Sequence, residues 1–228
     1  MKSDQEAKVI IDKALDEIVR YTVEWLHPHF AMDLPAQPNV KFDIVSQYDA
    51  KKRTISLQRE DFETESNYGI GHEVSHYLHH MTNPSTAGGY NHDYERNNLL
   101  ELVADYGAFL FCSERHDLVR ENKNKIIEQV RLSKTLSSLE RIPMTPAEKI
   151  FSSEVHTGGC SAARFLIEKY EEQYLPRFAT ANVEEAKELL LKLGWSKPLF
   201  IPYSEMEIPH AELEIIIEPP EEISELKP

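Results

Sequence analysis

The stretch Gly69-Ile70-Gly71-His72-Glu73-Val74-Ser75-His76-Tyr77-Leu78-His79-His80 organises the interpretation of the whole chain. An α-helix has about 3.6 residues per turn, so His72 and His76 lie one turn apart on the same face. Glu73 is rotated by about 100° from His72 on such a helix. Two imidazoles at this spacing bind one metal ion together, and the neighbouring carboxylate holds a water molecule. The stretch predicts a metal-binding helix with His72 and His76 as ligands and Glu73 as the catalytic base.

A second segment, Leu99-Leu100-Glu101-Leu102-Val103-Ala104-Asp105-Tyr106-Gly107-Ala108-Phe109-Leu110-Phe111-Cys112, supplies the next candidate ligand. It is apolar on nearly every side, which is typical of a buried helix, yet it carries two acids. Buried carboxylates are strongly unfavourable unless they are paired or bind a metal. The segment therefore predicts Glu101 as the third zinc ligand and Asp105 as the outer acceptor that orients an imidazole, His72. The alternative is an ordinary core in which both acids pair with Arg or Lys.

The chain resembles the gluzincin metallopeptidases, whose pattern is HExxH followed, on a second helix, by Glu-x-x-x-Asp. That pattern is matched by His72, Glu73, His76, Glu101 and Asp105, and the resemblance covers about residues 40–112. The phrasing is most similar to short members, such as the minigluzincins and the small peptidases that cleave phage-type repressors. The resemblance implies a gluzincin-like fold, one zinc ion as cofactor and a peptide or protein as substrate.

The remaining pattern predicts a mostly helical α+β fold with a small antiparallel sheet and a helical C-terminal lobe, and the resemblance implies that the sheet lies over the metal helix. Apolar residues at helical spacing predict a helix over about residues 6–26. Residues 40–44 and 54–57 alternate on either side of a polar turn, which predicts two antiparallel strands. The resemblance implies that a strand within 42–48 or 54–58 binds extended substrate by strand addition. A purely structural hairpin is the alternative.

Three sections are expected along the chain. Residues 1–94 form an N-terminal sublobe with the sheet and the HExxH helix, and residues 95–196 form a helical C-terminal sublobe with the third ligand. Residues 197–228 are an acidic, proline-containing tail with eight Glu and only two Lys. Minigluzincins are made as zymogens whose C-terminal segment covers the cleft, so the resemblance raises an autoinhibitory tail as one hypothesis. A tail that only packs or extends into solvent is the other.

Three further residues are candidates for stabilising the oxyanion of the reaction. In larger gluzincins a His of the C-terminal lobe has this role, and the resemblance makes His156 the candidate here. A capping or core His is the alternative for that position. Tyr90 and Tyr94 lie in the polar loop between the two ligand segments, where hydrogen-bond donors often border a cleft.

Composition limits the range of partners. The chain of 228 residues has a formal charge of −14, which disfavours non-specific binding to nucleic acid or to an anionic membrane. Its N-terminus has no apolar signal region, and no run approaches the ~18 apolar residues of a membrane span, so we expect a cytoplasmic protein.

Cys112 and Cys160 are expected to be buried thiols, with a disulfide between them as the alternative. The sequence leaves the oligomeric state open.

The function predicted from these features is hydrolysis of peptide bonds by a zinc-dependent endopeptidase. Three protein ligands leave a fourth zinc position for water, whose pKa zinc lowers from about 15.7 to about 7. Glu73 would accept the proton of this zinc-bound water as it attacks the peptide carbonyl. One alternative is a catalytically silent zinc-binding sensor or scaffold whose cleft is covered by the C-terminal tail. The other is a metal-free interaction protein whose acidic surface binds a basic partner.

Overall fold

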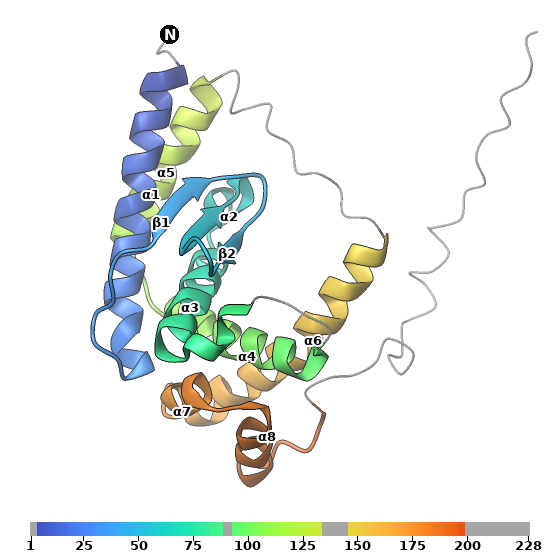
Figure 1. The fold of residues 1–228 in the computed structure, drawn as a ribbon. Helices are drawn as coiled ribbons and strands as arrows, with labels where there is room; N and C mark the ends of the chain where they lie inside the picture. Colours follow the sequence, from blue (N-terminus) through green and yellow to red (C-terminus); the bar gives the residue numbers. More distant parts are fainter. Residues whose placement is uncertain (1–3, 89–92, 134–145, 199–228) are drawn as a thin grey trace, which may run out of the picture.

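The computed structural model describes residues 4–88, 93–133 and 146–198. Helices make up most of this part of the chain, together with one three-stranded sheet, which confirms a mostly helical α+β class (Figure 1). The helices are α1 (Asp4–Leu26), η1 (His27–Phe30), α2 (Arg59–Glu63), α3 (Tyr68–Thr82), η2 (Pro84–Gly88), α4 (Tyr94–Ser113), α5 (Asp117–Leu132), α6 (Pro146–Tyr170), α7 (Leu175–Thr180) and α8 (Val183–Lys192). The strands are β1 (Asn39–Phe42), β2 (Gln47–Asp49) and β3 (Thr54–Leu57).

The helix predicted near the N-terminus is confirmed as α1, which lies side by side with α5 along one flank of the molecule (Figure 1). Its apolar residues recur every three or four positions and pack inward, and its charged residues face solvent. The buried residues of α1 are Ala7, Ile11, Ala14, Leu15, Ile18, Val19, Thr22, Val23 and Leu26. Neither α1 nor any other helix of the described residues combines the length and apolar character that crossing a bilayer requires.

The sheet is mixed, so the predicted antiparallel pairing of its first and last strands is wrong. β1 runs parallel to β3, with Val40 opposite Ile55. The antiparallel partner of β3 is β2, where Tyr48 lies opposite Ile55 across a turn that ends at Arg53 with a positive φ of 48°. The strand order is therefore β1-β3-β2. A strand as short as β2 shows too little alternation to be recognised from the sequence.

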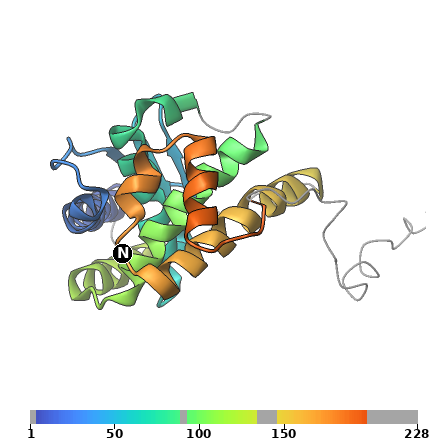
Figure 2. The same cartoon turned by 90° about the horizontal axis from the view of Figure 1, so that it is seen from below.

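α4 is the central helix of the fold. It packs along α3 on one side and along α6 on the other, and it also contacts α7 and α8 (Figure 2). Leu102, Val103 and Tyr106 of α4 are fully buried. One hydrophobic core joins these residues to α1, the sheet, α3, α5, α6, α7 and α8. The predicted sublobes on either side of residue 94 therefore share one core.

Glycines allow the three central helices to approach one another closely. A Cβ at Gly71 of α3 would lie 3.2 Å from the Cα of Ala108 in α4, so the missing side chain allows these two helices to come close. At Gly107 of α4, a Cβ would collide with the side chain of Ser75 in α3. At Gly159 of α6, a Cβ would lie 2.7 Å from the backbone oxygen of Asn98 in α4. These contacts set the spacing of α3, α4 and α6.

The two cysteines are free thiols, and the expectation that both are buried is wrong. Cys112 is exposed, because it lies in the last turn of α4, where the helix leaves the core. Its Sγ is 3.8 Å from the hydroxyl oxygen of Ser66. Cys160 is partly buried on α6. The disulfide alternative is therefore not seen.

We expect Gly159→Ala to destabilise the protein. The added methyl would meet backbone atoms of Asn98 and Leu102, which have no rotamer with which to move away. Overpacking of this kind costs about 1–3 kcal/mol, against a gain in helix propensity of at most about 1 kcal/mol. Chemical denaturation should show a lower free energy of unfolding. The control is Ser161→Ala at an exposed position of α6, where a change beyond about 0.5 kcal/mol would contradict this account.

Candidate metal centre

α3 presents two imidazoles on its side that faces α4. His72 is 7% exposed and His76 is half-buried. Their rings are perpendicular, with an interplanar angle of 88° and centroids 4.7 Å apart. The Nε2 atoms of the two rings are 3.1 Å apart. One helical turn therefore brings two nitrogen donors to a single point.

α4 brings a carboxylate to the same point. Glu101 is 0% exposed, and its Oε2 lies 3.4 Å from Nε2 of His72. Its Oε1 lies 3.3 Å from Nε2 of His76. Within the described parts of the chain, these three residues are the only group of His, Cys, Asp or Glu side chains whose ligand atoms converge, all within 4.8 Å of one another. They could hold a metal ion.

The spacing of these atoms suits one small divalent cation. Zinc binds imidazole nitrogen at about 2.0–2.1 Å and carboxylate oxygen at about 2.0–2.2 Å, so two ligand atoms of a tetrahedral site lie about 3.3–3.4 Å apart. The three separations here run from 3.1 to 3.4 Å. A donor set of two His and one Glu is also that of known catalytic zinc sites. The residues therefore fit the ion in both distance and chemistry.

Asp105 lies one turn after Glu101 on α4 and is fully buried. Its Oδ1 is 2.9 Å from Nδ1 of His72. A carboxylate only accepts hydrogen bonds, so this contact assigns a ring proton to Nδ1, and once Nε2 loses its own proton, its lone pair is directed towards Glu101 and His76. The contact is the one expected of an acceptor that orients a ligand imidazole.

The site has the electrostatics of a cation-binding cage. Burial lowers the pKa of His72, but the negative charges of Glu101 and Glu73 and the hydrogen bond to Asp105 outweigh it and raise this pKa well above 6.5. Glu73 is 7% exposed, and burial raises the pKa of its carboxyl, although the two imidazoles pull it down. A positive charge is therefore favoured among these groups, whether it is a proton or a metal ion.

His79 lies in the last turn of α3, which ends at Thr82, and it is only 1% exposed. Burial, with smaller contributions from His76 and Arg96, lowers its pKa to about 3, so the ring is neutral at pH 7. His80 points elsewhere, and its Nδ1 lies 2.7 Å from the hydroxyl oxygen of Tyr48 in β2. Neither residue belongs to the group of ligand atoms.

The candidates for the oxyanion contact lie outside what the structure describes. His156 falls within α6, but its side chain is not among the described ones. Tyr90 belongs to residues 89–92, which are not described, and the side chain of Tyr94 is likewise outside. Their roles remain predictions.

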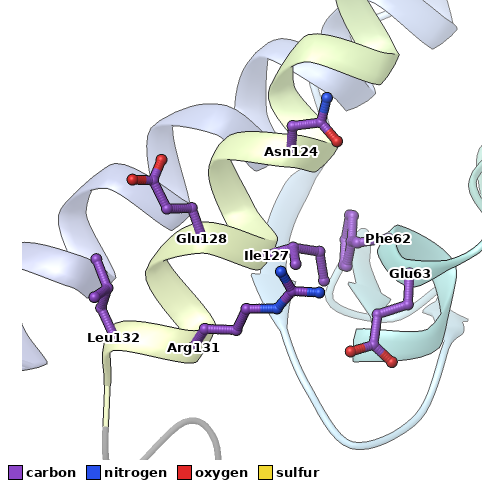
Figure 3. A pocket seen from close by; sticks show the side chains of 7 residues that line it. All are labelled: Phe62, Glu63, Asn124, Ile127, Glu128, Arg131 and Leu132. Atoms are coloured by element: carbon purple, nitrogen blue, oxygen red, sulfur yellow. The ribbon is translucent and has the colours of Figure 1, made fainter.

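A separate hollow lies between α2 and α5 (Figure 3). Phe62 and Glu63 of α2 face Ile127 and Arg131 of α5 across it. The lining mixes apolar and charged side chains and includes none of His72, His76 and Glu101, which we call the metal group. This hollow is therefore not part of the candidate metal centre.

Sequence reasoning missed two residues beside the metal group. Tyr68 donates a hydrogen bond from its hydroxyl to Asp105, and Tyr68 precedes His72 by four residues. The helical spacing that pairs His72 with His76 would also have placed Tyr68 on the same face. Cys160 of α6 lies near Asp105, and burial together with this carboxylate raises the pKa of its thiol. No sequence pattern links α6 to α4 at this point.

We expect zinc to stabilise the folded protein through Glu101. A ligand that binds only the folded state at about 100 times its Kd adds about 2.7 kcal/mol of stability. Zinc should therefore raise the melting temperature of the wild type but have little effect on Glu101→Gln, which lacks the ligand charge. The control is Glu95→Gln, the same change near the start of α4. An equal zinc-induced shift in wild type and Glu101→Gln would contradict the assignment.

We also expect zinc affinity to rise with pH above 6.5. An ordinary imidazole is mostly neutral above its usual pKa of about 6.5, so it no longer competes with metal there. The pKa of His72 is raised well above 6.5 in the metal-free site, so zinc must still displace a proton between 6.5 and that pKa. Each displaced proton makes the affinity increase about tenfold per pH unit. Chelator competition across this range checks the slope, and a flat profile would count against the raised pKa.

No family model, no curated protein and no solved structure matches this chain. A functional conclusion therefore rests on the residues of the candidate metal centre.

Proposed function

We propose that the protein is a zinc-dependent peptidase of the gluzincin kind, which hydrolyses internal peptide bonds. The observation that carries this proposal is the convergence of His72, His76 and Glu101 to separations of 3.1–3.4 Å, with a second buried carboxylate, Glu73, beside them. Structural zinc sites use four protein ligands, whereas catalytic sites use three and keep one position for water or substrate. A group of three supports a catalytic role.

Glu73 is the proposed general base. It follows His72 directly in α3, so its carboxylate leaves the helix at a different angle from the two ligands. Burial raises the pKa of this carboxyl, which makes it a stronger base than an exposed Glu. It accepts a proton from the attacking water and then passes that proton to the leaving amine. Zinc, when bound, supplies Lewis acidity, which lowers the pKa of water and polarises the peptide carbonyl.

The sheet offers a candidate surface for an extended substrate. β3 lies between β1 and β2, so both of its edges are paired and the proposed strand addition falls to an outer strand. β2 is an outer strand that packs against α3, where Tyr48 contacts the ring of Tyr77 and the imidazole of His80. A peptide that pairs with its free edge gains main-chain hydrogen bonds close to the metal helix. This position supports peptides as the substrate class.

We expect Glu73→Gln to retain zinc and to lose peptide hydrolysis. The amide keeps the shape of the side chain but is unable to accept the proton, and general-base catalysis contributes about 10²–10⁴-fold. Cleavage of a mixed peptide library, followed by mass spectrometry, measures the loss. The matched control is Glu65→Gln at an exposed position before α3, which should cleave like the wild type.

Two outcomes would decide against the proposed function. Undiminished cleavage by Glu73→Gln would refute the mechanism. Stoichiometric zinc without cleavage of any library peptide by the wild type would favour a catalytically silent zinc-binding scaffold. Elemental analysis of both proteins separates the loss of metal from the loss of catalysis.

A further inference from the structure

Oδ1 of Asp105 accepts two hydrogen bonds from α3. One comes from Nδ1 of His72, at 2.9 Å, and the other comes from the hydroxyl of Tyr68. Tyr68 and His72 are separated by four residues, so they lie one turn apart on the side of α3 that faces α4. The carboxylate is thus held between two donors of one helix.

The ring of Tyr68 is fixed by packing on both helices. It lies beside the imidazole of His72, with ring centroids 5.6 Å apart and an interplanar angle of 30°. It also contacts Phe109, which follows Asp105 by one turn of α4, with ring centroids 5.6 Å apart. An aromatic ring held from both helices leaves its hydroxyl little freedom, so the direction of the hydrogen bond to Asp105 is set by the packing.

The hydroxyl of Tyr68 remains a donor at working pH. An ordinary phenol has a pKa of about 10, so this hydroxyl is protonated near neutral pH. Cys160 is a further neighbour of Asp105, but a thiol is a weak donor. Tyr68 is therefore the stronger of these two neutral partners.

We propose that Tyr68 is a positioning residue of the metal centre, which acts through Asp105. Its hydroxyl holds the carboxylate against Nδ1 of His72 and so fixes the direction in which Nε2 of that ring points. Partners of this outer kind stabilise both the tautomer and the orientation of a ligand imidazole. The inference rests on the metal site of the proposed function, but it concerns affinity for the ion and not the hydrolytic step.

The test compares Tyr68→Phe with Tyr77→Phe. Both variants lose one part-buried, hydrogen-bonded hydroxyl from α3, but the hydroxyl of Tyr77 donates to the backbone oxygen of Ala36, away from the metal group. Loss of an outer partner lowers metal affinity by about 10–100-fold, and we expect about tenfold for Tyr68→Phe because it acts through Asp105. Tyr77→Phe should stay within about twofold of the wild type. Zinc titration against a chelator measures the affinity.

A double-mutant cycle with Asp105→Asn shows whether the effect passes through Asp105. If it does, Tyr68→Phe lowers zinc affinity in the wild type but has little further effect in the Asp105→Asn background. The resonance of the Nδ1 proton of His72 in the zinc-loaded protein should also move in Tyr68→Phe and stay in place in Tyr77→Phe. Neither readout follows from a loss of packing alone. The free energy of unfolding of the metal-free protein, measured separately, should be lowered to a similar extent in both variants.

The outcomes separate this inference from the proposed function. The inference would be overturned if Tyr68→Phe changed neither the zinc affinity nor the His72 resonance. Equal losses of zinc affinity in Tyr68→Phe and Tyr77→Phe would overturn it too. A wild type that binds no zinc would overturn both proposals. Zinc binding that depends on Tyr68 without any peptide cleavage would support the inference and overturn only the peptidase.

Discussion

The fold depends on the burial of two carboxylates, Glu101 and Asp105, in a helix that is otherwise apolar. Both are fully buried. Burying a negative charge without compensation costs several times the free energy that one hydrogen bond contributes to stability. The compensation comes from α3, whose His72 and His76 meet them across the interface. α4 therefore contacts α3 through charged and polar side chains as well as apolar ones. The packing of these two helices sets the positions of the carboxylates and imidazoles of the site.

Close packing makes this compensation geometrically possible. Gly71 and Gly107 allow α3 and α4 to approach, and Gly159 lets α6 rest on the turn of α4 that carries Glu101. A wider spacing would move the carboxylate away from the imidazoles and leave it buried without that compensation. The metal group is thus built on the most constrained part of the molecule, which is where a site that must hold its geometry is best placed.

How much the sequence could predict varies with the range of the interaction. The shared face of His72 and His76 and the course of α1 follow from helical spacing, which is local. The closeness of Glu101 to the imidazoles was expected from the cost of burying acids and from resemblance, since spacing within one helix says nothing of another. Strand pairing was not predictable, because β2 is too short to show alternation. The exposure of Cys112 depends on where α4 leaves the core, which no local pattern encodes.

The neighbouring residues His72 and Glu73 of α3 are influenced mainly by different physical interactions. His72 is held by directed contacts: Asp105 accepts from its Nδ1, and the ring of Tyr68 lies beside it. Glu73 is governed by burial and by the charges around it, both of which act on its pKa without fixing one hydrogen-bond direction. In the proposed metal site, changes along the path from Tyr68 through Asp105 would therefore act on the orientation of His72 and on metal affinity. Changes in the burial of Glu73 act on its basicity, because a carboxylate in a drier environment binds a proton more tightly. The two properties are also coupled, because the imidazole of His72 lowers the pKa of Glu73 and the carboxylate of Glu73 raises the pKa of His72.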